Sequence, residues 1–198
     1  FLTVFAVSLV GDGLNDAFHY KLDSGIMGVG GSVEGPLFNQ NGSFVASAHK
    51  DLVSLVMSFS DLTAVPYYWD TQGKVTYNFS PTTKLSGFYL YAEDGISVDS
   101  DDMDEEDVDE KFEFEYDTDQ YAVGGTLSKV YKNSYMDLTL SSTQNSWAQE
   151  FIDDTDTEAF HNYSTERTHT LKGSYTLFPS DYQEFTIGLG VSRSTFDY

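Results

Sequence analysis

The sequence predicts an all-β protein, an antiparallel transmembrane β-barrel of about nine meandering strands. Three observations favour this fold class. Apolar and polar residues alternate at period two in one segment after another. Short and long connections between those segments take turns along the chain. No apolar run approaches the roughly 18 to 20 residues that a transmembrane helix needs, and the mean hydropathy is -0.33, which a barrel tolerates because every second side chain faces its lumen.

The alternation is clearest in five segments. Their polar members are small or hydrophilic, such as Thr76, Thr139 and Ser174, which suits a watery lumen better than a dry core. The apolar members should therefore face lipid. This outward set includes Val75, Tyr77, Phe79, Leu127, Leu138, Leu171, Ile187 and Leu189.

Nine strands are expected, roughly at 17–26, 29–37, 43–54, 66–79, 84–98, 112–131, 134–148, 166–178 and 183–198. Short turns are predicted at 38–42, 80–83, 131–134 and 179–182, and long connections at about 55–65, 99–117 and 148–166. Outer-membrane barrels have short periplasmic turns and long outer loops. On that assignment the first and ninth strands both run outward, so we expect the chain to stop in the middle of a barrel.

Composition excludes several classes of partner and site. The net charge is -22, with 32 acidic and only 10 basic residues, so a nucleic-acid partner is not expected. The absence of cysteine excludes disulfides and Cys-based zinc or redox sites. Aromatic residues make up 16% of the chain, more than acidic disordered segments carry, so a folded protein is expected.

Aromatic residues gather near the expected strand ends. An interfacial girdle is the favoured interpretation, because an amphipathic ring suits the membrane boundary, and ordinary cross-strand pairing is the alternative. The clusters are Tyr67, Tyr68 and Trp69; Phe88, Tyr89 and Tyr91; Phe112, Phe114 and Tyr116; and Phe196 and Tyr198.

The acidic stretch 99–110 is the densest charged feature. It lacks the ligand spacing and the central glycine of an EF-hand, so a solvated and mobile outer loop is favoured, with loose Ca²⁺ or Mg²⁺ binding as the alternative. The weak candidate metal ligands are Asp101, Asp102, Asp104, Glu105 and Glu106.

No catalytic residue and no cofactor site is predicted, so the chain is not expected to be an enzyme. The histidines His19, His49, His161 and His169 lack zinc-site spacing. Gly28, Gly30 and Gly31 do not complete a dinucleotide fingerprint, and a tight strand-to-strand turn is the better explanation. No Gly-x-Ser-x-Gly elbow is present.

One family resemblance is specific. Phe18-His19, then Val33-Glu34-Gly35-Pro36-Leu37, then the run from Asn41 to Ala48, resembles the start of the barrel in TonB-dependent outer-membrane receptors. The similarity continues through Pro66-Tyr67-Tyr68-Trp69-Asp70 and the turn at Ser80-Pro81, and ends near Tyr91. One departure is His49-Lys50-Asp51-Leu52, where many relatives are rich in arginine.

The resemblance implies a domain division and a set of partners. Residues 1–16 would be the end of a plug domain and its linker, and 17–198 the N-terminal part of the barrel. The expected location is the outer membrane of a Gram-negative bacterium, with outer-membrane lipid around the strands. An energy-coupling inner-membrane complex would act through a plug not included here, and the transported scarce solute is unknown.

Two other functions stay open at this stage. The first is a small self-contained outer-membrane barrel, acting as a passive pore or as a structural or adhesive protein. The second is a soluble acidic β-sandwich that binds calcium or carbohydrate.

Overall fold

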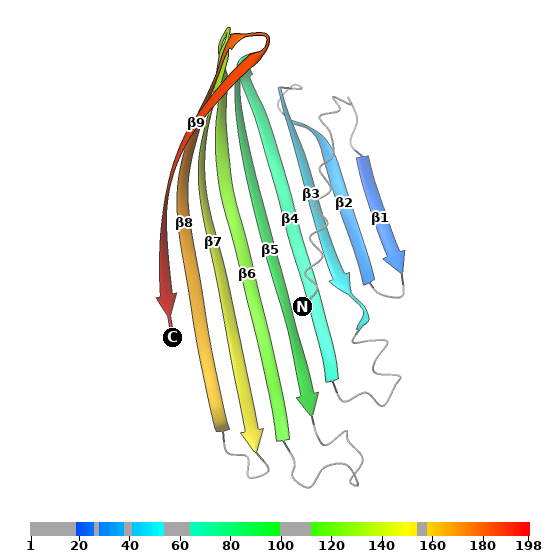
Figure 1. Ribbon diagram of the computed structural model, residues 1–198. Coiled ribbons are helices and arrows are strands. Elements are labelled where there is room, and N and C mark those ends of the chain that lie inside the picture. Colours follow the sequence, from blue (N-terminus) through cyan, green and yellow to red (C-terminus); the bar gives the residue numbers. More distant parts are fainter. Residues whose placement is uncertain (1–18, 26–27, 38–40, 54–63, 100–111, 154–157) are drawn as a thin grey trace.

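The computed structural model describes residues 19–25, 28–37, 41–53, 64–99, 112–153 and 158–198. Over these ranges the chain forms one sheet of nine antiparallel strands, in which each strand pairs with its neighbours in sequence (Figure 1). The strands are β1 (His19–Gly25), β2 (Gly28–Leu37), β3 (Gly42–Asp51), β4 (Ala64–Ser80), β5 (Thr83–Asp99), β6 (Phe112–Val130), β7 (Ser134–Asp153), β8 (Glu158–Ser180) and β9 (Gln183–Asp197).

All nine predicted strands are confirmed, but β7 and β8 are longer than predicted. β7 continues to Asp153 and β8 begins at Glu158, so most of the long connection expected at 148–166 is strand. By contrast, β6 begins at Phe112, as its predicted range of 112–131 has it, so only the overlapping part of the connection expected at 99–117 is wrong. Alternation is weak in the first part of β8, where polar side chains such as Asn162 and Ser164 lie on one face and Thr165 on the other. A period-two pattern cannot mark a strand whose two faces are both polar.

The short turns that join β4 to β5, β6 to β7 and β8 to β9 all lie at one end of the sheet (Figure 1). The turn after β6 is closed by a hydrogen bond in which the backbone amide of Tyr131 donates to the carbonyl oxygen of Ser134 at 2.7 Å. The opposite end, where β5, β6, β7 and β8 extend furthest, is called the loop end below, and the other the turn end.

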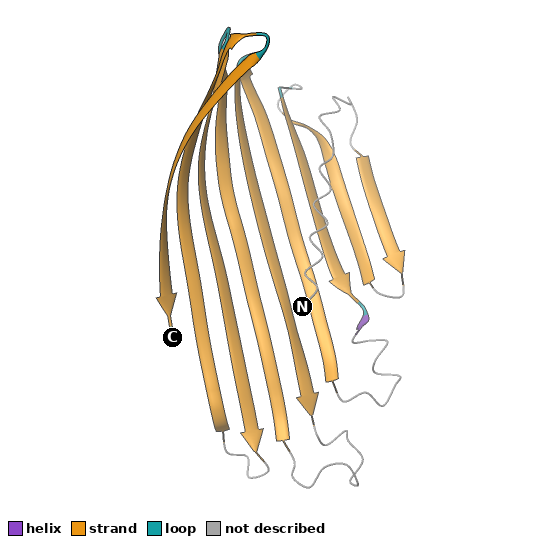
Figure 2. Ribbon diagram, viewed as in Figure 1, coloured by secondary structure: helices purple, strands orange, loops and turns teal. Residues whose placement is uncertain are grey.

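The described residues have no buried hydrophobic core. Every fully buried side chain among them is polar or charged, whereas large hydrophobic side chains such as Leu189 and Ile187 are 81% and 67% exposed. A β-sandwich buries the apolar faces of two sheets against each other. The described strands form a single layer (Figure 2), so the prediction of a soluble sandwich is wrong for them.

The sheet is open. β1 and β9 lie at its two edges, and no pairing joins them. The nine described strands by themselves therefore do not form the small self-contained barrel. Among the described residues, no helix is long and apolar enough to cross a membrane.

Gly30 and Gly31 lie within β2 and not in the tight turn expected from the sequence, whereas Gly28 begins β2 and pairs with Gly25, the last residue of β1. Gly31 pairs with Leu22 on one side and with Ala48 on the other. A glycine inside a strand often marks a close approach by a neighbour, and a methyl group at Gly30 would collide with the ring of His49.

The expected plug segment at 1–16 lies outside the described residues. The division of the chain at residue 16 therefore stays a prediction.

Candidate functional site

The register assigns each strand residue to one of two faces, because residues opposite each other in antiparallel strands lie on the same side of the sheet. We call one side the leucine face. It carries the row Tyr77, Leu85, Leu127, Leu138, Gly173 and Leu189, which crosses β4 to β9. The other side is the threonine face, with the row Thr76, Ser86, Thr126, Thr139, Lys172 and Gly190.

The leucine face is largely apolar towards the turn end, with Lys129 beside Met136 as a charged residue near the turns. The register places seven of the eight residues of the predicted outward set on it, which confirms that these seven share a face. The ring of the eighth, Phe79, contacts the ring of Tyr77 with centroids 5.0 Å apart. Most of the large exposed hydrophobic side chains also belong to this face, among them Leu140, Leu171 and Val191. An exposed apolar surface of this extent is typical of a membrane or protein interface.

The threonine face is hydrophilic over the same part of the strands. Hydroxyl pairs link adjacent strands here: Thr126 and Thr139 at 2.9 Å, Thr170 and Ser192 at 2.9 Å, and Thr176 and Thr186 at 2.8 Å. Lysines join them at Lys74, Lys84 and Lys172. Such a surface suits water and not lipid.

The leucine face changes character towards the loop end. Beyond Tyr91 on β5 it carries Glu93, and on the next strand Glu115, Asp117 and Asp119 lie on the same face. Carboxylates cannot be placed in hydrocarbon without a large free-energy cost. The apolar part of the leucine face therefore covers only about the half of the long strands nearest the turns.

The threonine face changes in the opposite sense. Near the loop end it carries the row Val98, Phe114, Phe151 and Phe160, followed towards the turns by the row Ile96, Tyr116, Gln149 and Asn162. The next row is Tyr68, Asp94, Thr118, Trp147 and Ser164. The two faces thus exchange polarity along the strands, and the aromatic surface at the loop end lies on the threonine face.

Aromatic side chains mark the change on the leucine face. Trp69 and Tyr91 contact each other with ring centroids 5.1 Å apart. The indole Nε1 of Trp69 donates to Oε2 of Glu93 at 3.0 Å, and the Tyr91 hydroxyl donates to the same oxygen at 3.4 Å. Rings with one apolar side and one hydrogen-bonding tip are typical of a membrane boundary.

The girdle prediction is only partly correct. Tyr67, Trp69, Tyr89 and Tyr91 lie on the leucine face, where a girdle would meet lipid, but the other described members of the first three predicted clusters lie on the threonine face. These others are Tyr68, Phe88, Phe114 and Tyr116. Adjacent residues in a strand point to opposite sides, which divides the clusters at 67–69 and 88–91 between the two faces. Phe114 and Tyr116 are two residues apart and lie together on the threonine face.

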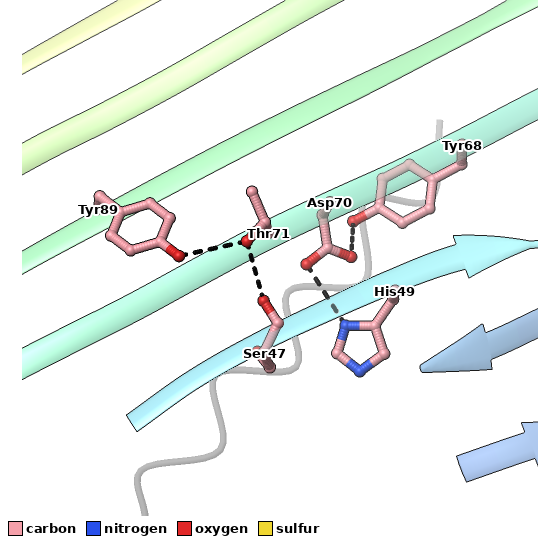
Figure 3. A network of polar contacts seen from close by, with 6 residues as sticks. All are labelled: Ser47, His49, Tyr68, Asp70, Thr71 and Tyr89. Atoms are coloured by element: carbon pink, nitrogen blue, oxygen red, sulfur yellow. Dashed lines mark hydrogen bonds and ion pairs between the residues drawn. The ribbon is translucent and has the colours of Figure 1, made fainter. Parts of the chain in front are cut away.

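A polar network joins β3, β4 and β5 (Figure 3). Asp70 is 8% exposed, and it accepts a hydrogen bond from the Tyr68 hydroxyl at 2.9 Å while His49 Nδ1 lies 3.4 Å from its other oxygen. On the other side of β4, the Thr71 hydroxyl donates to the backbone carbonyl of Ser47 at 3.1 Å. These contacts satisfy a buried carboxylate and tie β3 to β4.

The described residues contain no group of three His, Cys, Asp or Glu side chains that could hold a metal ion. His49 contacts Asp70, while His161 and His169 lie on the leucine face of β8. The candidate ligands Asp101, Asp102, Asp104, Glu105 and Glu106 lie outside the described residues, so metal binding by that stretch is not tested.

The aromatic surface on the threonine face is not among the features predicted from the sequence. The signal was present in the stretch from Phe112 to Asp119, where aromatic residues at 112, 114 and 116 alternate with acidic residues at 113, 115 and 117. That pattern predicts one aromatic and one acidic face. The sequence-based predictions instead assign these aromatic residues to a girdle and the range 99–117 to a connection.

No family model matches the sequence, and no curated protein is detectably similar to it. Solved structures do match. The sheet superposes on the copper transporter OprC with a TM-score of 0.63 and 10% identity, over 85% of this chain and 28% of that protein. It superposes on a mutant of the ferric enterobactin receptor PfeA from Pseudomonas aeruginosa with a TM-score of 0.59 and 11% identity, over 91% of this chain and 30% of that one.

These likenesses show the fold. The nine-stranded open sheet has the architecture of part of a TonB-dependent receptor barrel, as the sequence predicted. The chain spans less than a third of the length of the structures that it matches.

Proposed function

We propose that this chain is part of the barrel of a TonB-dependent receptor in a Gram-negative outer membrane, and that the whole protein takes up a scarce solute. The observation that carries the proposal is the exchange of polarity between the two faces. A soluble sheet has no reason to expose a large apolar surface near the turns and to replace it with carboxylates further along the same strands.

Strand length supports this proposal. A tilted strand crosses the hydrocarbon in about 9 to 11 residues, whereas β5, β6, β7 and β8 have 17, 19, 20 and 23 residues. The excess extends beyond the bilayer at the loop end. There the outside of the barrel meets water and becomes acidic, and the inside is free to become aromatic.

The threonine face would line the interior of the barrel. Its hydroxyl rows would lie at membrane depth, where a polar lumen is expected, and its aromatic rows would lie at the outer mouth. The plug and the energy-coupling partner enter the proposal through the family resemblance alone. The matched structures are a copper transporter and a ferric enterobactin receptor, so copper and iron chelates are the first solutes to test.

The test is solute uptake by the whole protein. Cells with and without the intact gene would be compared for depletion of iron chelates, copper, vitamins and glycans from the medium. Each comparison would be made with the inner-membrane energy-coupling complex active and inactivated. We expect one solute to be depleted only when both the gene and the coupling complex are present. Depletion that needs the gene but not the coupling would contradict a coupled receptor and indicate a passive pore.

A further inference from the structure

Asp94 is the charged residue of an otherwise uncharged row on the threonine face near the loop end. It pairs with Tyr68 on β4 and with Thr118 on β6, and Thr118 pairs in turn with Trp147 on β7. The Asp94 side chain is half-buried. Its carboxylate makes no hydrogen bond or ion pair with any residue that the structure describes.

A half-buried carboxylate without a partner is unfavourable, because burial removes water and nothing replaces it. A bound cation would supply the missing partner. By contrast, the nearby Asp70 is already satisfied, since the Tyr68 hydroxyl and the His49 ring contact its two oxygens. Asp94 is therefore an acceptor on this face that is available to a solute, and the half-buried Glu166 on β8, one row nearer the turns, is another.

The neighbours of Asp94 are suited to an organic cation. Directly opposite residues have Cβ atoms about 4.5 to 5.5 Å apart, so Tyr68 lies beside Asp94. Trp147 is two strands away, which is about 10 Å at the usual strand spacing. An ammonium group attracted by an aromatic ring lies within about 6 Å of the ring centroid. One cationic group can thus contact the Asp94 carboxylate while it approaches the Trp147 ring.

Charge on the surrounding surface favours the same kind of solute. On β4 to β8 the described threonine-face positions from the Asp94 row to the loop end contain no Lys or Arg. On these strands the described lysines of this face, Lys74, Lys84 and Lys172, all lie nearer the turns. With a net charge of -22 for the chain, the electrostatic field at the mouth would attract cations and repel anionic solutes.

A bare metal ion fits this surface poorly. Metal sites need several ligand atoms that converge on one point, and the described residues contain no such group. An organic cation is held by one carboxylate and by ring faces, which is what the row provides.

We infer that the outer mouth formed by β5, β6 and β7 binds a solute with an organic cationic group, which is held between Asp94 and Trp147. This inference rests on the proposed function. Binding of anionic chelates is disfavoured at this part of the threonine face. The aromatic rows beyond it, which include Tyr116 and Phe114, would cover apolar parts of the same solute.

Three small probes of nearly equal shape test the charge requirement. They are choline, its neutral isostere 3,3-dimethylbutan-1-ol and the anion 3,3-dimethylbutanoate. Binding to the detergent-solubilised whole receptor would be followed by saturation-transfer NMR. We expect saturable binding of choline at millimolar concentration and none of the anion. We expect the neutral isostere to bind about tenfold more weakly, a difference of about 1.4 kcal/mol.

Substitutions then test the residues. Asp94→Asn keeps the shape and removes the charge, and it should weaken choline binding about tenfold. Trp147→Leu should also weaken choline binding. The matched control is Asp137→Asn, on the threonine face of β7 near the turns, between Ser128 and Ser174, and it should bind choline as the unmodified receptor does. Heat-dependent gel mobility confirms that each variant is folded.

Several outcomes would overturn the inference. These are no saturable choline binding to the folded receptor, equal binding of choline and its neutral isostere, or no loss of binding in both Asp94→Asn and Trp147→Leu. None of these results depends on energy-coupled uptake, which is measured separately. A receptor that takes up another solute in a coupled manner but does not bind choline would leave the proposed function standing.

Discussion

The hydroxyl of Tyr67 on β4 donates a hydrogen bond of 2.5 Å to Oδ1 of Asp117 on β6, across the intervening strand β5. The residue between them is Gly95, which pairs with both. A methyl group at Gly95 would lie 2.6 Å from the carboxylate oxygen of Asp117 and 2.6 Å from the ring of Tyr67. The contact between β4 and β6 therefore depends on the absence of a side chain at position 95.

Gly95→Ala should destabilise the loop end of the sheet. The added methyl group forces the Tyr67 ring or the Asp117 carboxylate to move, and overpacking of this kind costs about 1 to 3 kcal/mol. The measurement is the unfolding temperature of the whole receptor in detergent. Gly87→Ala is the matched control, on the same strand and face, where a methyl group would meet only a carbonyl oxygen at 3.8 Å. Equal stability of the two variants would mean that the Tyr67 to Asp117 contact is not held across Gly95.

Leu138→Arg should impair barrel insertion. Leu138 is 44% exposed on the leucine face, and an arginine facing lipid near the bilayer centre costs about 2 to 4 kcal/mol. The control is Thr139→Arg, the next residue along β7, whose side chain points to the threonine face. Folding into lipid vesicles, followed by heat-dependent gel mobility, should be reduced for Leu138→Arg alone. Similar losses in both variants would argue against lipid on the leucine face.

One face of β6 should pass from lipid into water. Leu127 and Glu115 both lie on the leucine face of this strand, with Leu127 near the turns and Glu115 near the loop end. This chain has no cysteine, so Leu127→Cys and Glu115→Cys each introduce a single thiol into it. In intact cells a membrane-impermeant maleimide should label the cysteine at 115 and not that at 127. Labelling of both would place the whole face in water and contradict the membrane boundary at Trp69 and Tyr91.

The two ends of the sheet should lie on opposite sides of the outer membrane. An epitope inserted after Asn133, in the turn that follows β6, should be hidden from antibody in intact cells and detected after permeabilisation. The same epitope inserted between Asp104 and Glu105 should be detected in intact cells. The reverse pattern would invert the proposed orientation and would place the acidic stretch 99–110 in the periplasm.

Much of the fold could be predicted because alternation and turn chemistry are local. Residues such as Leu138, Thr139 and Leu140 reveal by themselves that a strand has one apolar and one polar face. Turns such as Ser80-Pro81 also depend on neighbouring residues alone. The nine strands and the shared face of the outward set followed from these signals. Strand ends near the loops did not, because both faces there include polar side chains and the alternation fades.

The functional surface was less accessible to sequence reasoning. The alternation from Phe112 to Asp119 indicates the polarity exchange on β6. The surface that results depends on which residues the neighbouring strands place beside it. Asp94 by itself is one acid among 32 acidic residues. Only its row identifies it as a half-buried carboxylate beside Tyr68 and near Trp147.

The sequence by itself thus determined the strands, the turns and the side to which each side chain of a strand points, since all three depend on backbone geometry over a few residues. Only the tertiary structure decided which residues meet across strands. Tyr67 and Asp117 are separated by 50 residues, and Asp94 approaches Trp147 only through the pairing of β5, β6 and β7. A shift of one residue in any of these pairings would turn the partner side chain to the other face. The contacts therefore depend on the register of the whole sheet and not on any one segment.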